Sequence, residues 1–259
     1  LCTGALLLSS FADTSAQLIK IGGGTTGNTA TQYPTPFGND NPGQRAQYLY
    51  RASELAAAGM KPGWIDSIGF NVLDASTTYL HTNFKLYIGP GTGGASSGVT
   101  AAPAPAAGAL TATGWQAGLG LVVFDPIIAY LPTTGMNVFK FSSPYYWNGY
   151  DNIVIGTCFW SGIATNNASV EWSTTLGFNA SRTYTTTTPT TGIGICDYTG
   201  TASTGTATSR PNAYFNNRFD TCSTTPTAGT AFATLPNPPD FCLYDDSLVL
   251  GLTGVSLSN

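Results

Sequence analysis

Short runs of strand-forming residues, separated by turn residues, recur along most of this chain. In Ser67–Leu73 the apolar side chains of Ile68, Phe70 and Val72 fall on one face, as expected of a half-buried strand. Gly, Pro, Asn and Asp separate the runs. The other runs are Gln47–Arg51, Asn83–Ile88, Leu121–Phe124, Asn137–Phe141, Ile153–Trp160 and Ser169–Trp172. This pattern predicts an all-β fold, an antiparallel β-sandwich or jelly roll.

A single helical turn interrupts this pattern. Ser53–Gly59 has the composition of a short helix, with Ser53 as its N-cap and Glu54 in its first turn. Gly59 is expected to end it, because glycine readily adopts the left-handed conformation that follows a helix.

Charged residues are scarce in a chain of 259 residues, which has 9 Lys+Arg, 13 Asp+Glu and one His. Enzymes draw their acids, bases and activated nucleophiles largely from these residues. No spacing in the sequence pairs its carboxylates. His81 has no Cys, Asp or Glu cluster beside it, so we expect an exposed polar residue. The sequence therefore predicts a protein that is not an enzyme and needs no cofactor.

The charge balance also limits the partners. A net charge of −4 does not fit a basic nucleic-acid footprint. No run of about 20 apolar residues is present, so no membrane span is predicted.

The composition divides the chain into three parts. Residues 1–16 combine the apolar stretch Ala5–Leu8 with small residues, as in the end of a secretory signal. The alternative is a retained strand that adds to a neighbouring subunit. Residues 17–218 form the predicted sandwich. Residues 219–259 are too few to form a stable core of their own without disulfides or other cross-links. We therefore expect a short disulfide-stapled β tail or the start of another module.

The cysteines indicate an oxidising, extracellular location. Apart from Cys2 there are four, Cys158, Cys196, Cys222 and Cys242, an even number that favours two disulfides. Of the three pairings we favour the sequential one, Cys158–Cys196 with Cys222–Cys242; free buried thiols are the alternative. The chain has no C-x-x-C pair, so zinc is not expected.

Two kinds of binding site deserve a test. Tyr145, Tyr146 and Trp147 are consecutive aromatic residues that could stack on sugar rings, although such residues more often fill a core or plug a turn. Loop calcium is the second candidate, because carboxylate and amide oxygens suit Ca²⁺. Its ligands would come from Asp40 with Asn39 and Asn41, or from Asp240, Asp245 and Asp246, although acidic residues in solvated turns are commoner.

Several phrases of the sequence occur in an order that we associate with one family. They are Gln47–Leu55, Ala58–Met60, Ile65–Val72, Thr82–Gly89, Tyr146–Gly149, Asn152–Ile155 with Cys158-Phe159, and Ser209–Asn212. Together they resemble the N-terminal β-sandwich of large multi-repeat surface proteins that Bacteroidota export through the type IX secretion system. In the tail, Cys222–Gly229, Cys242 and Leu248–Gly254 resemble the opening of an Ig-like repeat. The resemblance implies a secreted adhesin or gliding-associated protein, and none of the phrases is catalytic.

These observations lead to a functional expectation. The unpaired edge of a sheet can form hydrogen bonds with a strand of another chain unless charged side chains on the edge prevent it. This chain has few charged residues. We therefore expect a secreted cell-surface structural protein, a subunit of a filament or array that assembles with identical copies by strand addition. The alternative is a monomeric adhesin or carbohydrate-binding module. A viral jelly-roll capsid protein fits the composition, but the phrases argue against it.

Overall fold

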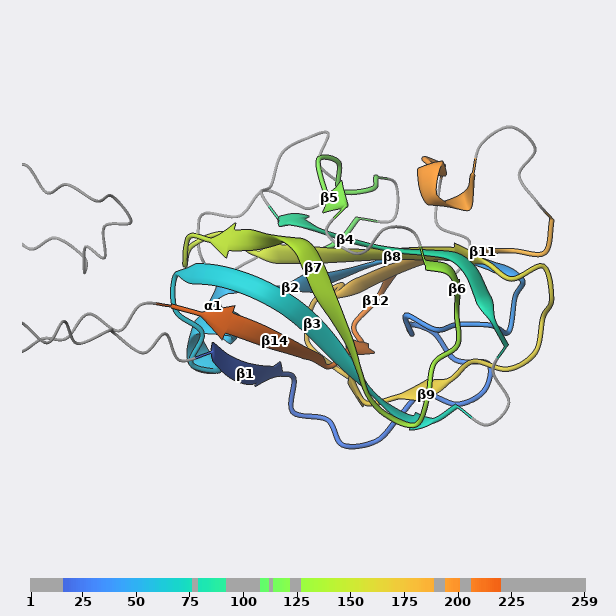
Figure 1. Cartoon of the computed structure of the whole chain (residues 1–259), viewed down its shortest axis with the longest axis horizontal. Coiled ribbons are helices and arrows are strands. Elements are labelled where there is room, and N and C mark those ends of the chain that lie inside the picture. The colour runs from blue at the N-terminus through green and yellow to red at the C-terminus, as the bar shows by residue number, and fades with distance from the viewer. Residues whose placement is uncertain are drawn as a thin grey trace, which may run out of the picture. The chain divides into compact units, whose positions relative to one another are not determined.

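The computed structural model describes residues 16–75, 79–91, 108–111, 114–121, 127–188, 194–200 and 206–219. All of them belong to one compact unit, Ala16–Phe219. Antiparallel strands in two main sheets make up most of this unit and enclose its core (Figure 1). The predicted all-β sandwich is confirmed. The expectations for residues 1–15 and 220–259, including the disulfide-stapled tail, lie outside the described residues.

The first sheet contains four main strands and a short fifth. Its order is β1 (Ala16–Ile21), β14 (Ala213–Arg218), β3 (Gly63–Asp74) and β7 (Gly135–Trp147), and β9 (Ser169–Val170) pairs with β3. In this order β1 and β7 are the edge strands. We call it the β7 sheet.

The second sheet contains seven strands, and we call it the β8 sheet. Its order is β12 (Thr206–Ala207), β11 (Ser181–Thr186), β2 (Gly43–Tyr50), β8 (Ile153–Trp160), β4 (His81–Pro90) and β5 (Gly120–Leu121), with β6 (Ile127–Tyr130) also on β4. A small pair, β10 (Trp172–Ser173) with β13 (Arg210–Pro211), and the 3-10 helix η1 (Ile195–Asp197) complete the described elements, apart from one α-helix.

The pairing of the strands is nested. β1 pairs with β14, β2 with β8, β3 with β7 and β4 with β6, all antiparallel. Successive nested pairs alternate between the two sheets, as they do when one long hairpin is wrapped into a sandwich. This connectivity is that of a jelly roll, with β11 and β12 added beside β2.

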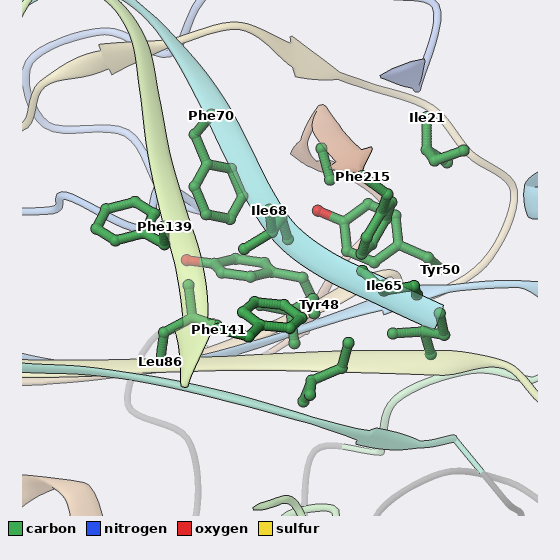
Figure 2. Packing of buried hydrophobic residues seen from close by; sticks show 14 of the residues in the cluster. Ile21, Tyr48, Tyr50, Ile65, Ile68, Phe70, Leu86, Phe139, Phe141 and Phe215 are labelled. Atoms are coloured by element: carbon green, nitrogen blue, oxygen red, sulfur yellow. The ribbon is translucent and has the colours of Figure 1, made fainter. Parts of the chain in front are cut away.

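The core lies between the inner faces of the two sheets. On β3, Ile68, Phe70 and Val72 are at most 1% exposed, which confirms the predicted alternation. Figure 2 shows Ile68 and Phe70 beside Tyr48 of β2, so both sheets supply the packing. Burying such side chains contributes about 1.5–3 kcal/mol each, which makes this cluster the main source of stability.

His81 is part of this core, so the prediction of an exposed residue is wrong. It is fully buried, and its ring centroid lies 4.0 Å from that of Phe159. The cause is a bulge in β4, where the pairing with β8 shifts between Thr82 and Lys85 and Asn83 adopts φ 51°. Because of the bulge, His81 and Phe84 both face inward although they are three residues apart.

The expected helix exists as α1 (Ala52–Ala57), but it begins earlier than predicted. Its N-cap position is Arg51, so Ser53 lies inside the first turn and does not cap it. Instead, the Arg51 N–H donates to the Glu54 carboxylate at 2.9 Å. Gly59 follows the last turn with φ +96°, as expected of the residue that ends the helix.

One of the two favoured disulfides is present. Cys158 and Cys196 are bonded, which joins β8 to η1 across 38 residues of sequence. Cys222 and Cys242 lie outside the described residues, so their pairing stays a prediction.

Candidate functional sites: an open sheet edge and a polar pocket

The three consecutive aromatic residues at the end of β7 do not form one platform. Trp147 is 1% exposed, and its Nε1–H donates to the backbone oxygen of Asp151 at 2.8 Å, so it plugs a turn. Tyr145 is half-buried and packs against the core. Only Tyr146 is exposed. Trp147 is thus not available to stack on a sugar, because neighbouring residues of a strand point to opposite faces.

Tyr146 has a partner that the sequence did not suggest. Trp64 of β3 lies opposite Tyr146 in the sheet, and their rings meet edge to face with centroids 5.2 Å apart. Further along β7, Met136 and Val138 are 40% and 53% exposed. A Cβ atom on Gly69 would lie within 3.5 Å of both of their side chains, so the two side chains cover Gly69 on the outer face.

β7 is an edge strand with little protection. It is 13 residues long, and Lys140 is its one charged residue. Register shifts locate a bulge: Ser67 pairs with Lys140, whereas Ile65 pairs with Tyr145. Bulges and prolines such as Pro144 hinder the pairing of an edge strand with a strand of another chain. Residues 135–141, ahead of the bulge, contain no proline or bulge, and they expose the apolar side chains of Met136 and Val138 beside the charged Lys140.

A pocket of about 280 Å³ lies on the outer face of the β8 sheet. Its floor comes from β2, β4 and β8, and its two walls are residues 116–119 and residues 196–199. The second wall includes part of η1, the short orange helix in Figure 1. Floor residues such as Gln47 are buried, whereas Ala117, Asp197 and Thr199 at the rim are exposed.

The first wall is held by side chains of the sheet. The Gln47 amide bonds the Gln116 backbone twice, accepting from its N–H and donating to its carbonyl, each at 2.9 Å. The Trp115 ring is flanked by the guanidinium groups of Arg45 and Arg182, at 4.5 and 4.2 Å from its centroid. Its Nε1–H donates to the Gly200 carbonyl at 2.8 Å, which links the two walls. Two cation–π contacts on one indole make a rigid support.

The second wall is fixed as firmly. The disulfide joins Cys196 to Cys158 of the floor. Tyr198 stacks on Tyr184 with centroids 3.6 Å apart, and Arg45 donates to the Tyr198 carbonyl. The pocket is therefore formed before any ligand arrives.

The pocket offers both donors and acceptors. Gln116 is 6% exposed, and its Oε1 has no hydrogen-bond partner among the residues that the structure describes. Asp197 adds a carboxylate. Burial raises the pKa of the Tyr87 hydroxyl, with the charge of Asp197 acting in the same direction, so Tyr87 is a donor at neutral pH. Burial lowers the pKa of Arg45 from 12.5, but the group stays charged because proteins do not deprotonate arginine near neutral pH.

One residue of the candidate calcium loop, Asn39, has a structural role. Asn39 is fully buried: its amide N–H donates to the Ile163 carbonyl at 2.7 Å, and its Oδ1 accepts from the Tyr79 N–H at 3.2 Å. Among the described residues, no group of three or more His, Cys, Asp and Glu side chains could hold a metal. Asp240, Asp245 and Asp246 lie outside the described part of the chain, and loop calcium stays a prediction.

Within the described ranges, no helix is long and apolar enough to cross a bilayer. Comparisons with protein-family models, with curated proteins and with solved structures find no match to this chain. The fold and the two sites are thus the observations from which function is argued.

Proposed function

We propose that the chain is a non-enzymatic, extracellular structural subunit that assembles with identical copies by strand addition at the β7 edge. The observation that carries this proposal is the long β7 edge strand, which has one charged residue, Lys140, and exposes the apolar side chains of Met136 and Val138. An added strand would form hydrogen bonds along the outer edge of residues 135–141, which pairs with no strand among the described residues, and its side chains would pack beside Met136 and Val138.

The proposed donor strand is residues 1–15 of a neighbouring copy, with the apolar stretch Ala5–Leu8, because Ala16 already belongs to β1. β1 begins at Ala16, opposite Arg218, and Arg218 in turn pairs with Trp64. The chain thus enters the β7 sheet at the end where Trp64 and Tyr146 are located. The disulfide and the resemblance to type IX-secreted surface proteins support an extracellular location.

A charged substitution on the edge tests the proposal. Val138→Glu places a carboxylate on the outer face of β7, where an added strand would leave it facing apolar side chains. We expect this variant to lose assemblies in sedimentation analysis. Ile163→Glu is the matched control, because Ile163 is also exposed (46%) but lies outside β7. Equal assembly by the two variants would overturn the proposal.

A further inference from the structure

We infer that the pocket on the β8 sheet binds one neutral sugar unit, a compact ligand rich in hydroxyl groups. The site is on the opposite sheet from the β7 edge, so the inference goes beyond assembly and does not depend on it.

The first argument is the unpartnered Gln116 Oε1. The residue is more than nine-tenths buried, lines the pocket, and keeps its amide nitrogen on the Ala117 carbonyl at 3.0 Å. Buried acceptors are almost always satisfied in proteins, so this oxygen lacks a donor. Because the oxygen itself is buried, a ligand can supply the donor only after the Gln116 side chain turns toward the pocket. A hydroxyl group supplies one.

The second argument is the balance of charge. Arg45 and Asp197 both line the pocket. Asp197 would therefore repel a free anion, and Arg45 would repel a free cation. A hydroxyl group donates and accepts at the same time. Sugar hydroxyls can therefore donate to Asp197 and Gln116 while they accept from Arg45 and Tyr87, and Leu119 offers apolar contact to the ring carbons.

The third argument is size and rigidity. The pocket's volume of about 280 Å³ is close to the lower end of ligand sites, roughly 300 Å³, which favours one ring over a chain of rings. Both walls are already fixed by Gln47, by Trp115 and by the disulfide. A pre-formed site loses less conformational freedom on binding.

Two NMR measurements on the intact chain test this inference: saturation transfer, which detects the bound ligand, and nitrogen–proton correlation spectra, which detect shifts of the protein N–H groups. The probes are glucose, galactose, mannose, N-acetylglucosamine and fucose, with acetate and methylammonium as the charged comparison. We expect at least one sugar to bind, with shifts of the Trp115 indole N–H and of the amides of residues 116–119. Binding of none of the five sugars, or tighter binding of acetate or methylammonium at these residues, would overturn the inference.

Three variants locate the contact. Asp197→Asn and Gln116→Leu each remove an acceptor and should weaken sugar binding about tenfold or more, because a lost hydrogen bond to a buried or charged group has about this effect. Asp197 is exposed, so its substitution leaves the fold intact even if Gln116→Leu does not. Asp151→Asn is the control away from the pocket and should bind as the wild type does. Unchanged affinity in Asp197→Asn would contradict the assignment, and the Val138→Glu variant should bind normally whether or not assembly is confirmed.

Discussion

At the scale of single residues, buried polar groups fasten the jelly roll together. Arg210 is fully buried, donates to both carboxylate oxygens of Glu54 at 2.7 and 3.0 Å, and lies 4.4 Å from the Tyr50 ring centroid. The Tyr50 hydroxyl donates to the Pro211 carbonyl at 2.9 Å. Two of the sequence phrases that carry the family resemblance, Gln47–Leu55 and Ser209–Asn212, thus meet in space, and there their residues have a structural role.

Removing Arg210 should therefore be costly. Arg210→Ala removes the guanidinium that donates to the Leu49 carbonyl and to both oxygens of Glu54, and it leaves Glu54 only the Arg51 N–H. We expect a loss of about 3–5 kcal/mol in the free energy of unfolding, measured with urea. Arg218→Ala breaks the more exposed pair with Asp66 and should lose no more than about 1 kcal/mol. Similar losses in the two variants would contradict the structural role.

His81 should make the fold sensitive to acid. Burial lowers its pKa from 6.5 to about 3, and backbone groups of Tyr130, Tyr79 and Phe37 offset only part of this effect. Between these two values the unfolded chain binds a proton that the folded chain does not. The free energy of unfolding should therefore fall by up to about 1.4 kcal/mol per unit as the pH drops from about 6.5 toward 3.

The variant His81→Phe isolates this contribution. Acidic residues titrate in both proteins, so the difference between their stability–pH slopes reports His81 alone. The slope of the variant should be shallower, by urea unfolding at a series of pH values. Identical slopes would show that His81 is not held neutral in the core.

At the scale of elements, regular alternation was predictable and its interruptions were not. The inner face of β3 followed from the period of two in Ser67–Leu73. In β4 a bulge at Asn83 reverses the alternation for His81, and at α1 the cap is set by Glu54, one residue beyond Ser53. The bulge depends on the pairing of β4 with β8, which a local pattern does not contain. The contact at α1 is local, but the capping group is the side chain of Glu54 and not that of Ser53.

The pocket could not be predicted for a related reason. Its residues come from β2, β4, β8 and two connecting segments that are separated by up to about 150 residues. The nearest sequence signal was the cysteine count, which suggested the Cys158–Cys196 bond but not the site that it helps to build.

The disulfide should stabilise both the fold and the pocket. Replacing Cys158 and Cys196 together with alanine removes a 38-residue cross-link, which should lower the free energy of unfolding by about 3–4 kcal/mol. The wall formed by η1 would then lose its link to β8, so sugar binding should weaken as well. Thermal unfolding and the NMR assay measure the two effects. Full sugar affinity in the variant would show that Arg45 and Tyr184 hold this wall without the disulfide.

At the scale of the whole molecule, the two faces of the sandwich have different roles in this account. The β8 sheet is covered at the pocket by two fixed segments, whereas the β7 sheet ends in a long strand with no paired neighbour among the described residues. The scarcity of charge, visible in the sequence, is what leaves that edge open. The nested jelly-roll pairing brings β3 beside β7, which places the half-buried Trp64 against the exposed Tyr146 and leaves Met136 and Val138 exposed over Gly69.

Negative-stain electron microscopy of the intact chain, beside a form that lacks residues 1–15, tests the central claim most directly. The account predicts regular filaments or arrays from the intact chain and dispersed particles from the shortened one, because the shortened chain lacks the donor strand for the β7 edge. Dispersed single particles from both would contradict assembly, and unchanged filaments after the deletion would rule out residues 1–15 as the donor.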